Sequence, residues 1–491
     1  MDSASKRAED QCLVVLFYAY FPTPLSVEAA DALRSAQEAL CVDLRSLKGR
    51  VLVSVDGVNG TLGGAPTEVE AYKAGVTRLL PPLRGPIDWK ESRFAMPSSG
   101  APFPDMRVKR VKEIVSSSGR LSTCGVGSGA SGGQHISPEE FHATLAAATP
   151  DDDLVVLDVR NRFEVAVGHF VDGAGRAAAQ PEMRTFEQFA DYVDRATAPS
   201  AEGVPGALRN KRVVMYCTGG IRCETASAYL VAKGCTKSVS QLDGGIHRYL
   251  DAYPRGDGTA EGGFFAGKNF VFDQRIAVRG NVGVEGTLME ENVAEGVTES
   301  AADTAREAPP PSSVGACVEC GCAWDALSPG AVCTVCVCLT LVCPRCRAEG
   351  ASRSGGGGGG RRYEWFCGAH RYLSECFVHF IDEHDRATLE GHKAALEELL
   401  RSADAADAAG APPPLHARTD ADMARRDRRT LARQLRRLQS RIAALRKGRK
   451  ATVRDASAAR RCRHCRKEGC SGKCWGFWKA PPASTARAAK G

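Results

Sequence analysis

The chain has 491 residues, 43% of them hydrophobic, so it is too long for one ordinary domain and has enough apolar residues for a sizeable core. No apolar run approaches the length of a membrane span. The first residues, MDSASKRAEDQC, lack the apolar core of a secretory signal and carry acidic residues that transit peptides avoid. We therefore expect a soluble, cytoplasmic protein without a membrane partner, with the nucleus and organelles left open.

Residues 12–115 predict a small α/β domain. Strands are expected at 13–21 and 49–55, helices at 29–41 and 66–80, and a turn at 58–60. This order over about a hundred residues predicts a small α/β sandwich.

Residues 134–280 predict a second α/β domain, which follows a Ser- and Gly-rich linker. Ser137, Pro138 and Glu140 are typical of a helix start, because serine caps, proline fits the first turn and glutamate occupies N3. Further strands are expected at 154–158, 213–216 and 239–242, and helices at 186–192 and 224–233. Such alternation predicts a mostly parallel sheet that binds ligands at the carboxyl ends of its strands.

A cysteine ends the strand at 213–216, within the sequence VVMYCTGGIRCE. Thr218, Gly219 and Gly220 are small enough for their backbone N–H groups to form a nest for an anion or adduct, and a helix directs its positive end at this loop. Arg222 adds a permanent charge. These features favour the thiolate of Cys217 and predict a nucleophile, with a buried core cysteine as the alternative.

This loop, with LDVRNRFEVAVGHF and LDGGI, resembles a rhodanese domain. With GKNFVFDQR, GRVLVSVDGVNGTLGG and FPDMRVKRVKEIV, the chain is similar to the tRNA uridine hydroxylase family over residues 13–376. The resemblance implies a rhodanese-like domain with a parallel sheet, preceded by a ferredoxin-like or acylphosphatase-like domain. It also implies that tRNA is the partner and that its wobble uridine becomes 5-hydroxyuridine, with molecular oxygen as co-substrate.

The resemblance makes Cys217 the essential cysteine. Its thiolate would attack uracil C6 and so activate C5, or it would carry oxygen or sulfur as a sulfenate or persulfide. Arg222 would hold the loop and its anion. Related phosphatases resemble Cys-x5-Arg, and the shorter spacing here disfavours phosphate chemistry. The alternative functions are a sulfurtransferase with a Cys217 persulfide and a non-catalytic RNA-binding zinc scaffold.

Five further residues have supporting roles. Asp158 and Arg160 resemble the rhodanese Asp-x-Arg element and are expected to brace the site. Glu164 and His169 are expected to bond the loop backbone, with a catalytic role for His169 as the alternative. Cys223 would either resolve an oxidised Cys217 or pack in the core. Besides these, a basic run at Lys109, Arg110 and Lys112 would contact tRNA phosphate or form a solvated strand face.

Residues 315–380 predict a zinc-binding segment. Paired C-x-x-C units without a secretory signal indicate reduced thiols that hold structural zinc, with an iron–sulfur centre as the alternative. The expected ligands are Cys317, Cys320, Cys333, Cys336, Cys343, Cys346, Cys367 and Cys376. Cys322 and Cys338 compete with them, so the sequence leaves open which thiols share an ion.

The carboxyl-terminal part is basic, with 22 Lys and Arg against 4 Asp and Glu from residue 421 onward. Residues 384–450 predict a helical tail with a short apolar stripe at heptad spacing. Residues 460–480 contain a second candidate zinc group, formed by Cys462, Cys465, Cys470 and Cys474. The tail binds RNA or extends into solvent as a disordered segment.

Overall fold

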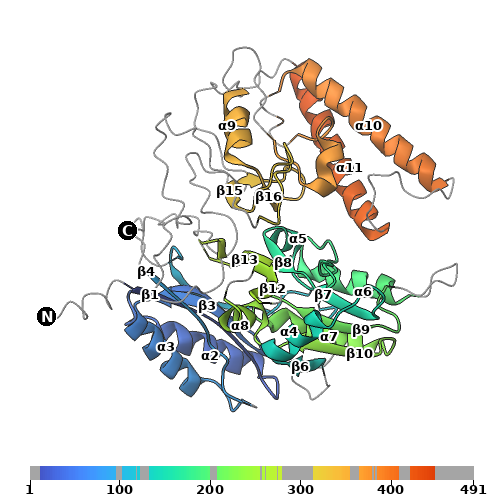
Figure 1. Ribbon diagram of the computed structural model, residues 1–491. Coiled ribbons are helices and arrows are strands. Elements are labelled where there is room, and N and C mark those ends of the chain that lie inside the picture. Colours follow the sequence, from blue (N-terminus) through green and yellow to red (C-terminus); the bar gives the residue numbers. More distant parts are fainter. Residues whose placement is uncertain are drawn as a thin grey trace, which may run out of the picture. The chain divides into compact units, whose positions relative to one another are not determined.

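A computed structural model gives the fold of residues 11–278, apart from 84, 96–101, 118, 122–131, 199–206, 255–256, 260 and 274. It also describes residues 313–447, apart from 354–363, 379–380, 382–383 and 409–420. The chain divides into two compact units. The first contains both α/β domains, and the second contains the cysteine-rich segment and the last two helices (Figure 1).

The amino-terminal domain is a five-stranded sheet with two helices on one face (Figure 1). Its elements are β1 (Gln11–Tyr20), α2 (Val27–Leu40), β2 (Lys48–Val53), β3 (Gly57–Gly64), α3 (Pro66–Leu79), β4 (Lys90–Ala95) and β5 (Met106–Arg110). The strand order is β4-β1-β3-β2-β5, and only β2 and β5 pair in parallel. The predicted strands and helices are confirmed, and β4 and β5 are additional.

The predicted turn at 58–60 is wrong, because these residues lie inside β3. The hairpin turns earlier, where the Ser54 N–H donates to the Gly57 carbonyl over 2.9 Å. Gly60 serves packing instead: a Cβ there would lie 2.5 Å from the Phe17 ring. An asparagine–glycine pair usually signals a turn, but here tertiary packing uses the glycine in a strand.

The two faces of β1 have different partners because side chains alternate along a strand. Leu13, Val15 and Phe17 are buried in the core beneath α2 and α3. Leu16 and Tyr18 point to the opposite face and reach the second domain. This face of the sheet therefore helps to build the candidate site.

The second domain has a parallel four-stranded sheet in the order β6-β10-β9-β7. Its elements are β6 (Gln134–Ile136), α4 (Pro138–Ala146), β7 (Leu154–Asp158), α5 (Arg162–Val165), β8 (Gly168–Phe170), α6 (Phe189–Thr197), β9 (Arg212–Tyr216), α7 (Ile221–Ala232), β10 (Ser238–Leu242) and α8 (Gly245–Ala252). The predicted parallel sheet is confirmed. So is the helix start, since Ser137 and Glu140 form a capping box before α4.

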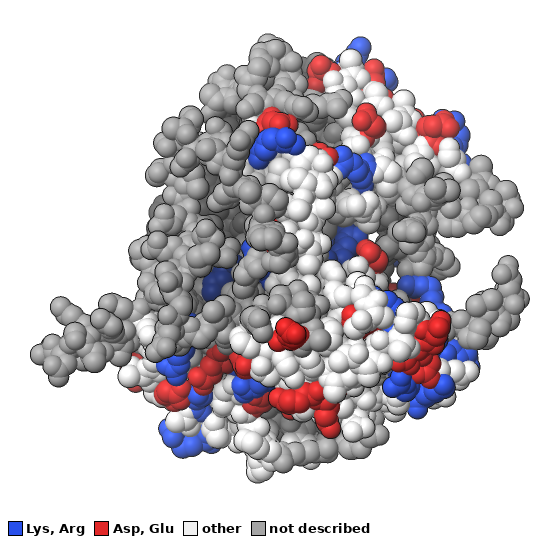
Figure 2. Space-filling model, in the orientation of Figure 1, with Lys and Arg blue, Asp and Glu red and all other residues white. Residues whose placement is uncertain are grey.

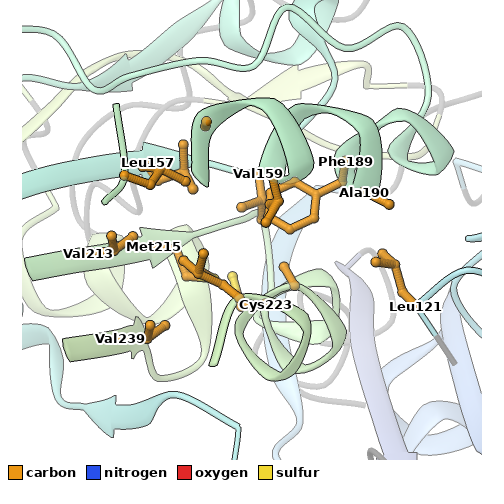
Figure 3. Packing of buried hydrophobic residues seen from close by; sticks show 14 of the residues in the cluster. Leu121, Leu157, Val159, Phe189, Ala190, Val213, Met215, Cys223 and Val239 are labelled. Carbon is orange, nitrogen blue, oxygen red and sulfur yellow. The ribbon is translucent and has the colours of Figure 1, made fainter. Parts of the chain in front are cut away.

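An apolar core lies between this sheet and α6 and α7. Figure 3 shows Val213 and Met215 of β9 beside Leu157 of β7, facing Phe189 of α6. Cys223 of α7 lies in the same cluster. This packing fixes the end of β9 and the start of α7, and hence the loop between them.

Short strands complete the second domain after α8. They are β11 (Asp257–Thr259), β12 (Gly263–Gly267), β13 (Asn269–Phe270) and β14 (Ala277–Val278). Strand β12 pairs with β8, and β13 pairs with β14.

The second unit contains β15 (Leu327–Val332), β16 (Leu339–Leu341), α9 (Pro344–Arg353), α10 (Arg386–Ala408) and α11 (Ala421–Arg446). The predicted apolar stripe of the tail packs within the chain: Leu431, Leu438 and Ile442 of α11 share a core with Leu389 and Leu396 of α10. In the described part of the chain, none of the helices is long and apolar enough to cross a bilayer.

Candidate active site and metal groups

The Cys217 loop connects β9 to α7 at the carboxyl end of the parallel sheet. Cys217 has no exposed surface, and its Sγ accepts a hydrogen bond from the Gly220 N–H over 3.1 Å. Gly220 has a φ of 95°, which an L side chain rarely adopts. The loop therefore curls its backbone donors around the sulfur, as a nest requires.

These donors make Cys217 acidic. Burial alone would raise its pKa, but a hydrogen bond from Cys223, the charge of Arg222 and the backbone N–H groups of Arg222 and Gly219 outweigh it. The pKa of Cys217 falls from its ordinary 9.0 to about 5. Cys217 is consequently a thiolate at neutral pH.

Cys223 remains a thiol. Burial, and then its hydrogen bond to Cys217, raise the pKa of Cys223 well above its ordinary range. Its thiol therefore donates a hydrogen bond to the Cys217 sulfur, while its side chain packs in the core of Figure 3. The two sulfurs differ in protonation although they lie side by side.

Arg222 is held by a buried carboxylate. Its guanidinium donates to both carboxylate oxygens of Glu164, over 2.8 and 2.7 Å, and to the Thr218 hydroxyl over 3.2 Å. The Glu164 side chain has no exposed surface. Glu164 thus bonds side chains of the loop, where the sequence led us to expect bonds to its backbone.

Asp158 and Arg160 form a second buried pair. Arg160 Nε and Nη2 donate to Asp158, and Nη2 also donates to the Gly168 carbonyl over 2.6 Å. Both side chains have no exposed surface. This pair ties β7 to β8 and makes no hydrogen bond to Cys217 among the described contacts.

His169 lies on β8, with its Nδ1 3.4 Å from the Val165 carbonyl oxygen. Burial lowers its pKa. The sequence led us to expect His169 to bond the loop backbone. The contact in the structure is instead to Val165 at the end of α5.

The amino-terminal domain covers the loop, which the sequence did not reveal. A Cβ on Gly219 would lie 2.6 Å from Leu16 Cδ2, and one on Gly220 would lie 2.9 Å from the Tyr18 hydroxyl. The only residue without a Cβ is glycine, so both positions permit this close approach. Lys90 of β4 lies 4.8 Å from the Tyr18 ring and is buried as well.

A polar network joins Tyr18 to the second domain. The Tyr18 hydroxyl donates to Glu224 in the first turn of α7 over 3.0 Å, and Gln241 donates to the other oxygen over 3.2 Å. His135 completes the network: hydrogen bonds to Asp243 and then to Glu224 raise its pKa to about 10. The two domains are therefore connected at the start of the helix that follows the Cys217 loop.

We expect Tyr18→Phe to expose Cys217. Losing one hydrogen bond costs about 1 kcal/mol and favours local opening by roughly fivefold. Alkylation of Cys217 by iodoacetamide, followed by peptide mass spectrometry, should accelerate by that factor. Tyr72→Phe is the matched control, because it removes an equally long 3.0 Å bond, to Gln37, in the core of the same domain. Equal alkylation rates in the two variants would contradict this role of Tyr18.

The predicted basic run lies on and just after β5. Lys109 and Lys112 are exposed, whereas Arg110 contacts Asp31 over 3.4 Å. On the face in Figure 2, acidic and basic side chains of the described residues lie close together. Of the three residues of the basic run, Lys109 and Lys112 are therefore the ones exposed to solvent.

Two groups of cysteines in the second unit could hold metal ions. One consists of Cys317, Cys320, Cys322 and Cys343, and the other of Cys333, Cys336, Cys338 and Cys367. Within each group the sulfur atoms lie within 4.8 Å of one another. Cys376 lies apart, buried in the core with α10, and its thiol faces the Leu373 carbonyl. Cys462, Cys465, Cys470 and Cys474 lie outside the described residues.

Comparisons with known proteins agree with both domains. A family model described as the UPF0176 acylphosphatase like domain matches residues 12–114. A model described as the rhodanese-like domain matches residues 137–252. The acylphosphatase-like and rhodanese-like folds expected from the resemblance are confirmed.

Curated relatives identify the family. A tRNA uridine(34) hydroxylase of Nitrobacter hamburgensis is 35% identical over 266 residues, which are 54% of this chain and 91% of that protein. The chain belongs to the tRNA uridine(34) hydroxylase family. Another member, from Pseudarthrobacter chlorophenolicus, is 39% identical over 54% of this chain and 79% of its own length.

A plant relative is similar to a longer part of this chain than the two bacterial hydroxylases are. The rhodanese-like domain-containing protein 6 of Arabidopsis thaliana is 34% identical over 363 residues, which are 71% of this chain and 53% of that protein. The chain thus spans about half the length of the plant protein. The 71% of the chain that is matched is more than the first unit contains, so the similarity continues into the second unit.

Proposed function

We propose that this chain hydroxylates the wobble uridine of tRNA at C5, with Cys217 as the reacting side chain. The observation that carries the proposal is the buried Cys217 thiolate, held by the Gly220 N–H in a member of this family. A catalytic thiolate must be both deprotonated and positioned, and the loop supplies both conditions.

The chemistry follows from the electrons of the thiolate. The sulfur lone pair forms a bond to C6 of uracil, and the C5–C6 π electrons move towards C5 and the C4 carbonyl. The nucleophilic C5 then forms a bond to oxygen, and loss of the C5 proton expels the thiolate. With molecular oxygen as the source, the second oxygen atom becomes water, which consumes two electrons and two protons from a two-electron donor.

Arg222 and its neighbours have supporting roles. Arg222 neutralises the loop anion, Thr218, Gly219 and Gly220 form its cradle, and Asp158 with Arg160 braces the strand ends. Because Cys217 is fully buried, a base reaches it only after the covering side chains move. The cover formed by Tyr18 and Leu16 is where we expect this movement.

Several finer features belong to the same proposal. The cysteine groups hold structural zinc, since clustered thiolates suit this ion. The basic tail binds the phosphates of tRNA, and Lys109 and Lys112 extend that contact. The reaction takes place in the cytoplasm.

A sulfurtransferase is the second candidate, favoured by the match to the rhodanese-like domain. The same cradle would stabilise a persulfide on Cys217. Consumption of cyanide in the presence of thiosulfate measures that activity directly.

We expect Cys217→Ser to abolish hydroxylation in cells, because a serine hydroxyl remains protonated at neutral pH. The comparison uses cells whose only copy of the protein is the wild-type chain and cells whose only copy is Cys217→Ser. Mass spectrometry of their tRNA nucleosides measures 5-hydroxyuridine. Loss of 5-hydroxyuridine and its derivatives with Cys217→Ser supports the proposal. Unchanged levels of these nucleosides, with the protein present, would refute it.

A further inference from the structure

Four ligand pairs with the same spacing lie along the cysteine-rich segment. They are Cys317 with Cys320, Cys333 with Cys336, Cys343 with Cys346, and Cys367 with His370. The last pair ends in a histidine, so it is a C-x-x-H unit and not a C-x-x-C unit. His370 is buried, like Cys367.

Backbone contacts bring the first pair to the third. The Val318 N–H donates to the Leu341 carbonyl at the end of β16 over 2.9 Å, and the Cys343 N–H donates to Cys317 Sγ over 3.4 Å. Cys320 Sγ and Cys343 Sγ are 3.8 Å apart. Two thiolates on one tetrahedral zinc, with bonds of about 2.3 Å, lie about 3.8 Å apart.

Cys346 fits this first group better than Cys322. The Cys346 thiol contacts the thiols of Cys320, Cys343 and Cys317. Cys322 Sγ also lies within 4.8 Å of the sulfur atoms of Cys317, Cys320 and Cys343, but Cys322 is exposed whereas Cys346 is buried. Cys346 also has the same spacing from Cys343 as Cys320 has from Cys317, and paired C-x-x-C units are the usual ligands of structural zinc, which favours Cys346 as the fourth ligand.

Backbone contacts also bring the second pair to the fourth. The Thr334 N–H donates to the Trp365 carbonyl over 2.7 Å, just before Cys367. Cys336 Sγ lies 3.9 Å from Cys367 Sγ. His370 Nδ1 lies 3.2 Å from Cys367 Sγ and 3.7 Å from Cys333 Sγ. These three cysteines and the imidazole surround one position.

Cys338 does not fit the same ion together with Cys336. Their sulfur atoms are 3.0 Å apart, well below the separation of about 3.8 Å that two thiolates have on a tetrahedral zinc. Four ligands complete such a site, and His370 supplies the fourth without Cys338.

We infer that the segment binds two zinc ions through interleaved ligand pairs. The first and third pairs hold one ion, and the second and fourth pairs hold the other, with His370 as a ligand. Cys322, Cys338 and Cys376 are not ligands. The inference rests on the proposal that this segment binds zinc. Interleaving makes the two sites interdependent, because each ion closes a loop that contains a ligand pair of the other.

The test counts zinc by native mass spectrometry of the full chain after dialysis against a weak chelator. The parent carries Cys462→Ser and Cys465→Ser, which removes the candidate group of the tail. We expect two zinc ions in the parent, and the same number in Cys376→Ser and Cys338→Ser. His370→Ala should lose at least one ion, and His370→Cys, which restores a ligand, should keep two.

The possible results distinguish a failure of zinc binding itself from a failure of the ligand assignment. A parent chain without zinc would overturn the zinc assignment as a whole. Two ions retained by His370→Ala, or one ion lost from Cys338→Ser or Cys376→Ser, would overturn only the ligand assignment. The cobalt(II) form adds a second readout, because replacing His370 by cysteine should strengthen the sulfur-to-metal absorption.

Discussion

Glu164→Ala is expected to destabilise the first unit by about 3–5 kcal/mol, because it leaves the buried charge of Arg222 without its partner. Such a loss is a large part of the stability of an ordinary domain. Denaturant unfolding of the full chain, followed by the fluorescence of the first unit, measures it. A change similar to that of a surface variant would contradict the role given to this pair.

Two further variants make the Glu164 experiment specific. Glu91→Ala removes an ion pair with Lys73 at a partly exposed position and should cost less than about 1 kcal/mol. Replacing both partners, as Glu164→Leu with Arg222→Met, should recover most of the stability, since an apolar pair needs no compensation. The double variant should still fail to hydroxylate tRNA, because the charge beside Cys217 is gone. Recovered activity would contradict the contribution of Arg222.

The Cys217 thiolate is expected to form with a pKa of about 5. The ultraviolet difference spectrum between the wild-type chain and Cys217→Ser should show one thiolate that appears as the pH rises through this value. The folded pKa lies below the unfolded one, so the thiolate stabilises the fold fully above the unfolded pKa of about 9. This contribution is lost as the pH falls through about 5.

Two substitutions of Cys223 separate the effect of its hydrogen bond on the Cys217 pKa from the effect of its side-chain volume. Cys223→Ala removes the donor and should raise the pKa of Cys217, whereas Cys223→Ser keeps a donor and should leave it low. Both variants lack a thiol that could resolve an oxidised Cys217. If the two titrate alike, hydrogen bonding by Cys223 does not set the acidity of Cys217.

Local patterns were sufficient to predict the loop and its scaffold. The run before Cys217 is a buried strand, and Ser137 caps its helix, because these features depend on neighbours in the sequence. Helix α7 begins at Ile221, three residues before its expected start. The positive φ of Gly220 allows the chain to enter the helix directly after the loop.

Contacts between distant segments could not be predicted in this way. Nothing near Tyr18 in the sequence indicates that it reaches Glu224, 206 residues away. The alternation along β1 shows that the strand has two faces, but not which partner covers the second one. His370 was missed for a related reason, since its role depends on the backbone contact between Thr334 and Trp365.

The most direct test of the account is the reaction of purified chain with tRNA that contains an unmodified wobble uridine, under labelled oxygen and with a two-electron donor. Nucleoside mass spectrometry then follows the wobble position. This uridine should gain one labelled oxygen atom with the wild-type chain and none with Cys217→Ser. Equal hydroxylation by both forms, or sulfur in place of oxygen, would contradict it.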